Sequence, residues 1–247
     1  MAELGLTWLA ALLVLGLAGF GFWRYIWFFR NPSRQAPVGD NLVSPADGTV
    51  VYVKEVEPRE QVISIKRGVQ ASINDIVQAD LERPRILVGV FMSPFNVHYN
   101  RAPLSGTVEF IRHHPPRSVN RHMGPMHWRS LLKHLPIYRN SVHIMENERT
   151  VTKFKGSFRG EELSAYVVQI AGKNVHGIDS YFEPGSQVAK GDIFGMIRIG
   201  SQVDLVVTKL PGMVVKVRPG DKVRAGETIF VALTPDRGNR QQKDTTP

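Results

Sequence analysis

The feature that most constrains this chain is an uncharged, apolar segment near its N-terminus. No charged residue occurs from Leu4 to Trp23, and apolar residues resume after Arg24. About 20 apolar residues are enough for a helix to cross the hydrocarbon core of a bilayer. Residues 1–30 are therefore predicted to form a membrane anchor helix.

The residues around this segment predict its orientation. Its C-terminal end carries aromatic residues of the kind found at membrane interfaces, followed by a group of arginines: Trp23, Tyr25 and Trp27, then Arg24, Arg30 and Arg34. Glu3 is the only charged residue at the other end. Because basic residues stay on the cytoplasmic side, the body is expected at the cytoplasmic face of the cell membrane. A cleaved signal peptide fits less well, since no basic residue precedes the segment and no small-x-small site closes it. A monotopic hairpin or a tilted interfacial helix stays an alternative.

The rest of the chain is predicted to be mainly β, an α+β body over residues 31–234. Short runs rich in β-branched and aromatic residues indicate strands: 49–53, 62–65, 86–92, 166–170, 193–199, 203–207, 213–217 and 229–233. Residues 70–81 fit either a short helix or a lid-like loop, and no long amphipathic helix is evident. The polar residues 235–247 are expected to form a disordered tail.

A repeat indicates the architecture of the second half. The segment from Pro184 to Phe194 matches the segment from Pro219 to Phe230, 35 residues later. Each copy reads as a turn, a short strand, a second turn and a strand. Two such hairpins resemble the barrel-sandwich hybrid of lipoyl and biotinyl domains, which predicts a fold but not a function.

Composition narrows the chemistry. The chain has no cysteine, which excludes disulfides, thiolate metal sites and cysteine nucleophiles. A net charge of +9 favours anionic partners such as lipid headgroups or nucleic acid, and the anchor favours the lipid. No metal-binding or nucleotide-binding motif occurs. Between Glu109 and Glu146 the chain carries six basic residues and no acid. This segment is either a solvated loop or a lipid-facing lid that binds headgroups.

Four further stretches follow one another along the chain: Phe28-Phe29-Arg30-Asn31-Pro32, Ser44-Pro45-Ala46-Asp47-Gly48, the stretch from Phe91 to Pro103, and Asn147-Glu148-Arg149. Taken in order, they resemble the phosphatidylserine decarboxylases, in the short prokaryotic form of that family. The resemblance runs from about Phe28 to about Leu233. It implies an enzyme that converts phosphatidylserine to phosphatidylethanolamine and carbon dioxide in phospholipid biosynthesis.

The resemblance also implies a cofactor made from the chain itself. In the family, a serine hydroxyl attacks the preceding carbonyl, the resulting ester undergoes β-elimination, and the dehydroalanine hydrolyses to a pyruvoyl group and ammonia. Here Ser201 would be that serine, and cleavage after Gly200 would give a β chain, 1–200, and an α chain, 201–247. The pyruvoyl ketone would form a Schiff base with the substrate amine and accept electrons during decarboxylation.

A Gly-Ser pair is a weak signal alone, and the sequence holds three of them. Gly156-Ser157 is expected in a polar turn and Gly185-Ser186 in an exposed hairpin turn. Only Gly200-Ser201 lies between two apolar strands, so its position selects it. Glycine also suits the step, because it lacks a Cβ and leaves its carbonyl open to attack.

The resemblance assigns the remaining site residues. Asp47 would orient or charge the base that activates Ser201, although by itself it reads as a turn residue. His98 would handle protons during decarboxylation. Longer family members carry a second histidine three residues later, where this chain has Arg101, and arginine cannot act as a base at neutral pH. Arg101 and Asn100 are therefore expected to bind substrate, and the base for self-cleavage stays open.

The sequence leaves two other functions open. A membrane-tethered, lipoyl-like adaptor would share the anchor and the repeat, although Lys209 lacks the hairpin setting of a modified lysine. A non-catalytic relative of the decarboxylases is the other, because of Arg101. The sequence does not separate a diacyl lipid from an archaeal ether lipid, nor a monomer from a homo-oligomer.

Overall fold

The computed structural model describes residues 1–57, 61–66, 69–72, 83–139, 141–173, 177–198 and 200–233. The predicted tail at 235–247 lies outside the described residues, as do residues 73–81 of the predicted helix or lid.

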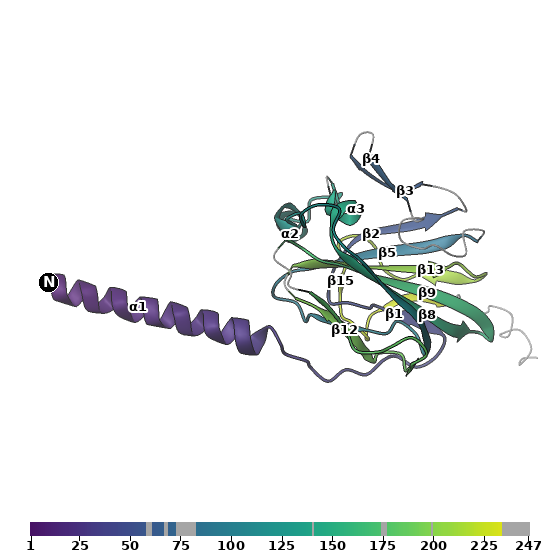
Figure 1. Ribbon diagram of the computed structural model, residues 1–247, viewed down its shortest axis with the longest axis horizontal. Helices are drawn as coiled ribbons and strands as arrows, with labels where there is room; N and C mark the ends of the chain where they lie inside the picture. The colour runs from purple at the N-terminus through teal and green to yellow at the C-terminus, as the bar shows by residue number, and fades with distance from the viewer. Residues whose placement is uncertain are drawn as a thin grey trace, which may run out of the picture.

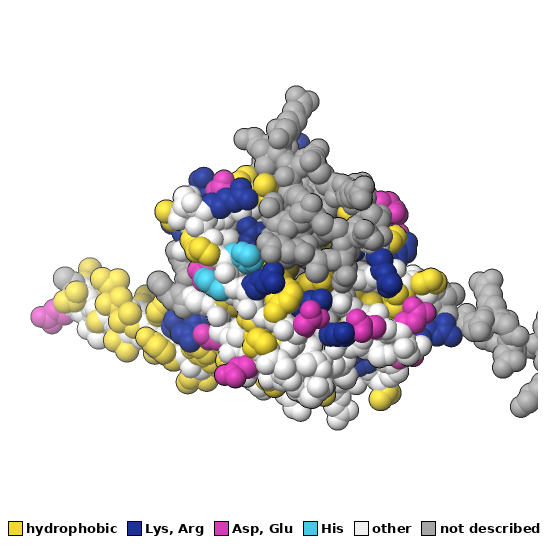
Figure 2. Space-filling model, turned by 45° about the vertical axis from the view of Figure 1, so that its right-hand side comes forward, with side chains coloured by type: hydrophobic (Ala, Val, Ile, Leu, Met, Phe, Trp, Pro, Cys, Tyr) yellow, Lys and Arg dark blue, Asp and Glu magenta, His cyan; other side chains and the backbone are white. Residues whose placement is uncertain are grey.

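The predicted anchor is a single projecting helix. Helix α1 (Ala2–Phe22) continues into one π-helical turn, η1 (Trp23–Trp27). Figure 1 shows α1 extending away from the body, and Figure 2 shows hydrophobic side chains along it. A stretch of 23 residues, Gly5–Trp27, is long and apolar enough to cross a membrane, and none of it is buried against the body. The helix therefore indicates membrane association.

The body is built on one curled, eight-stranded antiparallel sheet, which confirms the mainly β prediction (Figure 1). In spatial order its strands are β11 (Gln187–Val188), β7 (Gly106–His114), β8 (Arg149–Phe158), β9 (Glu161–Ile170), β13 (Ser201–Thr208), β5 (Arg85–Met92), β2 (Gly48–Val56) and β15 (Lys222–Val223).

The sequence repeat appears as matched structure. The short strands β11 and β15 form the two opposite edges of the large sheet. The longer strand of each copy is the middle strand of a small sheet. These small sheets are β10 (Ile178–Ser180), β12 (Ile193–Ile197) and β6 (Tyr99–Arg101), and β1 (Asn41–Val43), β16 (Ile229–Leu233) and β14 (Met213–Val215).

Three local predictions need correction. Residues 70–72 belong to β4 (Val69–Ser72), which pairs with β3 (Gln61–Lys66), so no helix begins at Gln70. Gly156-Ser157 lies within β8 and not in a turn. The solvated-loop alternative for the basic segment is wrong over part of its length, because the segment contains the end of β7 and two short helices, α2 (Gly124–Leu131) and α3 (His143–Glu146).

Both faces of the central strands are buried. On β13, Val203, Leu205 and Val207 face the larger core, while Val206 faces a second core covered by residues of α2 and α3. Every residue of β5 and β13 is buried. Strands covered on both faces read as continuous apolar runs, which is why the sequence predicted these two correctly. Gly89 of β5 makes room for Tyr52, because a Cβ there would collide with the tyrosine ring.

Candidate active site

Ser201 is placed where the large sheet meets a cavity. It is the first residue of β13, its side chain is fully buried, and it pairs with Met92 at the end of β5. Ser157 is exposed and Ser186 is half-buried, so Ser201 is the only buried serine among the three Gly-Ser pairs. Among the three pairs, the structure thus buries the serine of the pair that lies between two apolar strands, although Gly156-Ser157 lies in a strand and not in the predicted turn.

Gly200 sets the backbone conformation just before Ser201. It has a left-handed φ of +58°, a conformation that favours glycine. Apart from its chain neighbours, no heavy atom of the described residues lies within 4 Å of a Cβ built at Gly200, and Gly200 lines the cavity. The Gly200–Ser201 peptide therefore joins an open position to a buried one.

The thioether of Met92 links Ser201 to Asn100. The Ser201 Oγ lies 3.5 Å from Met92 Sδ, and Asn100 Nδ2 lies 3.7 Å from the same sulfur. Asn100 is fully buried, and its Oδ1 accepts a hydrogen bond of 2.8 Å from Gln169. Thioether sulfur is a weak acceptor, so the Ser201 hydroxyl is held loosely.

His98 is a buried histidine with free nitrogens. It lies between β5 and β6, and its ring packs against Phe28 with centroids 4.2 Å apart. Neither ring nitrogen has a hydrogen-bond partner among the described residues. Burial lowers the pKa of His98 to about 4, and Arg30 adds to the shift. The Asn96 backbone and the Asp47 carboxylate oppose it, although Asn96 does not reach hydrogen-bonding geometry. His98 is therefore neutral at pH 7 and can accept a proton.

Asp47 is engaged by the linker that follows the anchor. Both of its carboxylate oxygens accept hydrogen bonds from Arg34, at 2.5 and 2.9 Å. The backbone N–H of Ala225 donates a third bond, of 2.8 Å. In the described part of the chain, Asp47 makes no hydrogen bond to His98 or Ser201. It acts on His98 through its charge.

Arg101 also contacts the linker. Its guanidinium donates hydrogen bonds to the Gly191 carbonyl at 2.8 Å and to Asn31 Oδ1 at 2.9 Å. Only 8% of Arg101 is exposed, and burial lowers the pKa of its guanidinium. These contacts fix the linker to the first repeat. The structure thus places Arg101 beside Asp47 and Arg34, whose charges act on it, and not on the wall of the cavity.

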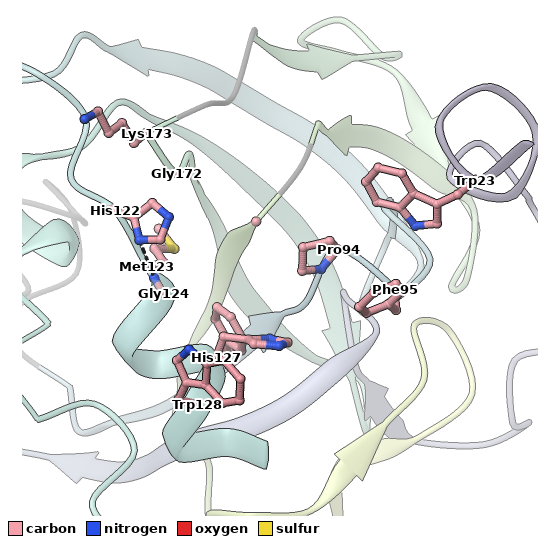
Figure 3. A pocket seen from close by; sticks show the side chains of 12 residues that line it. Trp23, Pro94, Phe95, His122, Met123, Gly124, His127, Trp128, Gly172 and Lys173 are labelled. Atoms are coloured by element: carbon pink, nitrogen blue, oxygen red, sulfur yellow. Dashed lines mark hydrogen bonds between the residues drawn. The ribbon is translucent and has the colours of Figure 1, made fainter. Parts of the chain in front are cut away.

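The cavity has a volume of about 480 Å³, within the range of small-molecule sites. Figure 3 shows Trp23 and Phe95 on one side of it and His127 and Trp128 of α2 on the other. Its polar groups include Lys173 and the backbone at Gly200. The cavity is therefore mostly apolar and lies between the end of the anchor and α2.

A buried polar network on the other face of β13 was not predicted. Gln202 Oε1 lies 3.0 Å from His143 Nε2, and Gln202 Nε2 donates to Tyr52 Oη and Asp204 Oδ1, each at 2.7 Å. The Tyr52 hydroxyl donates to the second Asp204 oxygen, also at 2.7 Å. An amide oxygen only accepts, so His143 carries its proton on Nε2. This network holds the side chain that follows Ser201.

Burial changes the acidity of every titratable member of the network. It raises the pKa of Asp204 to about 6 and the pKa of Tyr52 well above its usual value, and the Asp204 charge adds to the latter. Burial lowers the pKa of His143 to about 4. The only signal in the sequence was a carboxylate, Asp204, inside an otherwise apolar strand.

Comparison with known proteins places the chain in a family. The sequence profile of the phosphatidylserine decarboxylases matches residues 22–231. A Methanopyrus kandleri protein provisionally named archaetidylserine decarboxylase proenzyme is 37% identical over 224 residues, which cover 90% of this chain and 86% of that protein. Phosphatidylserine decarboxylase proenzymes of Paramagnetospirillum magneticum and Amoebophilus asiaticus are 32% and 30% identical. Those matches cover 96% and 86% of this chain, and 80% and 76% of the respective relatives. The match overrides the adaptor alternative: the chain belongs to the phosphatidylserine decarboxylase family and is a decarboxylase made as a proenzyme.

Proposed function

We propose that this chain cuts itself between Gly200 and Ser201 and then decarboxylates phosphatidylserine to phosphatidylethanolamine at the cytoplasmic face of the membrane. The observation that carries the proposal is the setting of Ser201. It is the one buried serine of three Gly-Ser pairs, and it follows a left-handed glycine on a cavity wall.

The local geometry fits a self-cleaving serine. A left-handed Gly200 with open space around its Cα leaves room for the peptide to bend toward the Ser201 hydroxyl. Among the described residues, the hydroxyl contacts the weak acceptor Met92, so little is lost when it moves. Because Gln202 is held by three partners, the bend is confined to the side of Gly200. After β-elimination, one water hydrolyses the dehydroalanine at position 201, releasing ammonia.

The site also fits a pyruvoyl group formed at that position. The pyruvoyl ketone supplies the electron sink that decarboxylation of an amino acid requires. The new chain end would lie at the start of β13, beside the buried amide of Asn100 and the cavity. The apolar walls bind the lipid next to its headgroup, and Lys173 complements a phosphate.

His98 is the proton carrier that the structure supports best. A buried polar atom without a partner costs about 1–3 kcal/mol, so two of them on one ring need an explanation. We assign His98 to the proton that replaces carbon dioxide on the substrate. Asp47 serves self-cleavage only if Arg34 releases one of its oxygens, and otherwise it sets the charge around His98.

Intact mass spectrometry tests the proposal. The wild-type chain should give two fragments, 1–200 and 201–247, the smaller one with a pyruvoyl N-terminus. Ser201→Ala should run uncut near 27.7 kDa. Ser186→Ala is the matched control, because Gly185-Ser186-Gln187-Val188 repeats the same four letters as the cleavage site, and this variant should cleave like the wild type.

Activity is measured as carbon dioxide released from vesicles that contain phosphatidylserine. Cleaved protein should release it and Ser201→Ala should not. An uncut wild-type chain with an ordinary Ser201 would refute the proposal and leave a non-catalytic relative.

A further inference from the structure

Helix α2 has two apolar faces, and the body covers only one of them. Met126 and Ser130 are buried, and the Ser130 hydroxyl bonds to Thr49 at 2.9 Å. On the outward side, three large residues follow helical spacing, with exposures of 62% for Trp128, 61% for Leu131 and 58% for Leu132. A soluble helix normally carries polar residues on its outward face.

The turn after α2 continues this surface. Leu135 is 65% exposed, and Lys133 and His134, which lie between the leucines, are exposed as well. We call Trp128, Leu131, Leu132 and Leu135 the outer face of α2. Apolar residues with a lysine between them are typical of segments that lie in the interface of an anionic membrane. No acidic residue occurs from 110 to 145, so nothing in this segment repels such a surface.

The outer face lies at the end of the body that carries the anchor. Trp128 and Trp23, the residue that follows α1, line the same cavity (Figure 3). Phe95, which is 63% exposed, has its ring 6.2 Å from that of Trp23. Figure 1 shows α2 on the side of the body from which α1 projects. An apolar surface beside a membrane helix is continuous with the membrane contact of that helix.

We propose that the outer face of α2 inserts into the interfacial layer of the bilayer that α1 enters, so that the cavity opens to lipid between two membrane-bound elements. Trp128 and Trp23 then flank the entrance, and a lipid reaches the cavity without its acyl chains crossing water. This assigns the basic segment as lipid-facing, one of the two roles that the sequence left open.

Depth measurements on the full chain test this contact independently of any reaction. The sequence has no cysteine, so Leu132→Cys gives a single site for an environment-sensitive fluorophore. Glu161→Cys is the control. Glu161 is exposed and is the first residue of β9, whereas the last residue of β9, Ile170, pairs with Gln202 beside the site. Glu161 therefore lies at the end of β9 that points away from the site. Both labelled proteins are reconstituted in vesicles of phosphatidylglycerol and phosphatidylethanolamine.

The label at position 132 should emit at shorter wavelength than the label at position 161. Lipids with a nitroxide near the headgroup should quench it, while the control stays unquenched. Equal emission and equal quenching at the two positions would overturn the proposal. The proposal would also be overturned if the label at position 132 were shielded at high protein density but not in vesicles that hold a single chain each. That result would mean that the outer face contacts a second copy of the chain.

A kinetic test adds the consequence for catalysis and rests on the proposed function. The triple variant Leu131→Ser, Leu132→Ser, Leu135→Ser should cleave itself normally. It should lose decarboxylation of phosphatidylserine in vesicles but keep it on a short-chain phosphatidylserine dissolved as monomers. Equal rates on vesicles for wild type and variant would overturn the docking role. No release from either substrate by the wild type would instead refute the proposed function.

Discussion

Replacing the two buried histidines should change the free energy of unfolding in opposite directions, although burial lowers the pKa of both to about 4. His98 has no hydrogen-bond partner among the described residues, whereas His143 donates to Gln202. Replacing each by phenylalanine removes the same titration but different contacts. The uncut Ser201→Ala chain is the right background, because unfolding then involves a single polypeptide.

The acid dependence has the same sign for both histidines. Each ring is neutral in the folded protein down to about pH 4 and charged in the unfolded chain below 6.5. Between these values the unfolded state binds more protons, so stability is fully present above pH 6.5 and is lost as the pH falls toward 4. At about 1.4 kcal/mol per pKa unit, the full loss per histidine is about 3 kcal/mol, of which about 2 kcal/mol is lost by pH 5.

The hydrogen bonds predict a difference at pH 8. His98→Phe removes two unpartnered buried nitrogens and keeps a ring against Phe28, so the free energy of unfolding should rise by about 1 kcal/mol. His143→Phe leaves the Gln202 carbonyl oxygen buried without its donor, which should lower the free energy of unfolding by about 1–3 kcal/mol. Between pH 8 and pH 5, the free energy of unfolding of each variant should fall by about 2 kcal/mol less than that of the parent.

Urea unfolding in detergent micelles, followed by the circular dichroism of the β body at both pH values, measures these differences. If His98→Phe is destabilised at pH 8 as strongly as His143→Phe, the ring nitrogens of His98 have partners in the protein. If its pH dependence matches that of the parent, His98 does not titrate as described. In either case His98 loses its support as the proton carrier.

Three further predictions follow from the same contacts. Gly200→Ala should slow self-cleavage in a mass-spectrometric time course and cost about 1–2 kcal/mol in stability, because its left-handed φ is strained for alanine while its Cβ meets no atom. Asp204→Asn should abolish a pH dependence of about 3 kcal/mol in the free energy of unfolding, in which the parent is most stable below pH 3.8 and loses stability as the pH rises through about 6, measured by urea unfolding at pH 4 and 7. Deleting residues 1–22 should leave self-cleavage intact in detergent, whereas deleting residues 1–40 should lower the free energy of unfolding in urea, because buried Asp47 and Arg101 would lose their hydrogen bonds to Arg34 and Asn31.

The parts of the fold that could be predicted from sequence are those with an uninterrupted pattern. The apolar runs of β5 and β13 are continuous because both faces of these strands are buried. Strand β8 carries Lys153 and Lys155 among its apolar residues, and Lys153 pairs with Glu109 of β7. These charges hid the strand pattern in the middle of the chain. Helix α2 was missed because one of its apolar faces points outward, which breaks the usual amphipathic period.

The position of Ser201 could be predicted because it depends on local pattern, namely a glycine between two apolar strands. The environment of the other site residues depends on distant contacts. Asp47 is bound by Arg34 and by the backbone of Ala225, which is 178 residues away. Single-sequence reasoning has no access to such pairings. The role of Asp47 therefore came from resemblance alone, and its engagement by Arg34 was not foreseen.

The linker between anchor and body makes several contacts with the residues around the candidate site. Arg30 donates to the Phe95 carbonyl at 2.6 Å, Asn31 accepts from Arg101, and Arg34 binds Asp47. Each contact joins a linker residue to one of the stretches that identify the family. Since Arg30 and Asp47 also act electrostatically on His98, the linker helps to set the charge at the site. The segment that follows the anchor therefore contacts two of the candidate site residues, Asp47 and Arg101, and places a charge near a third, His98.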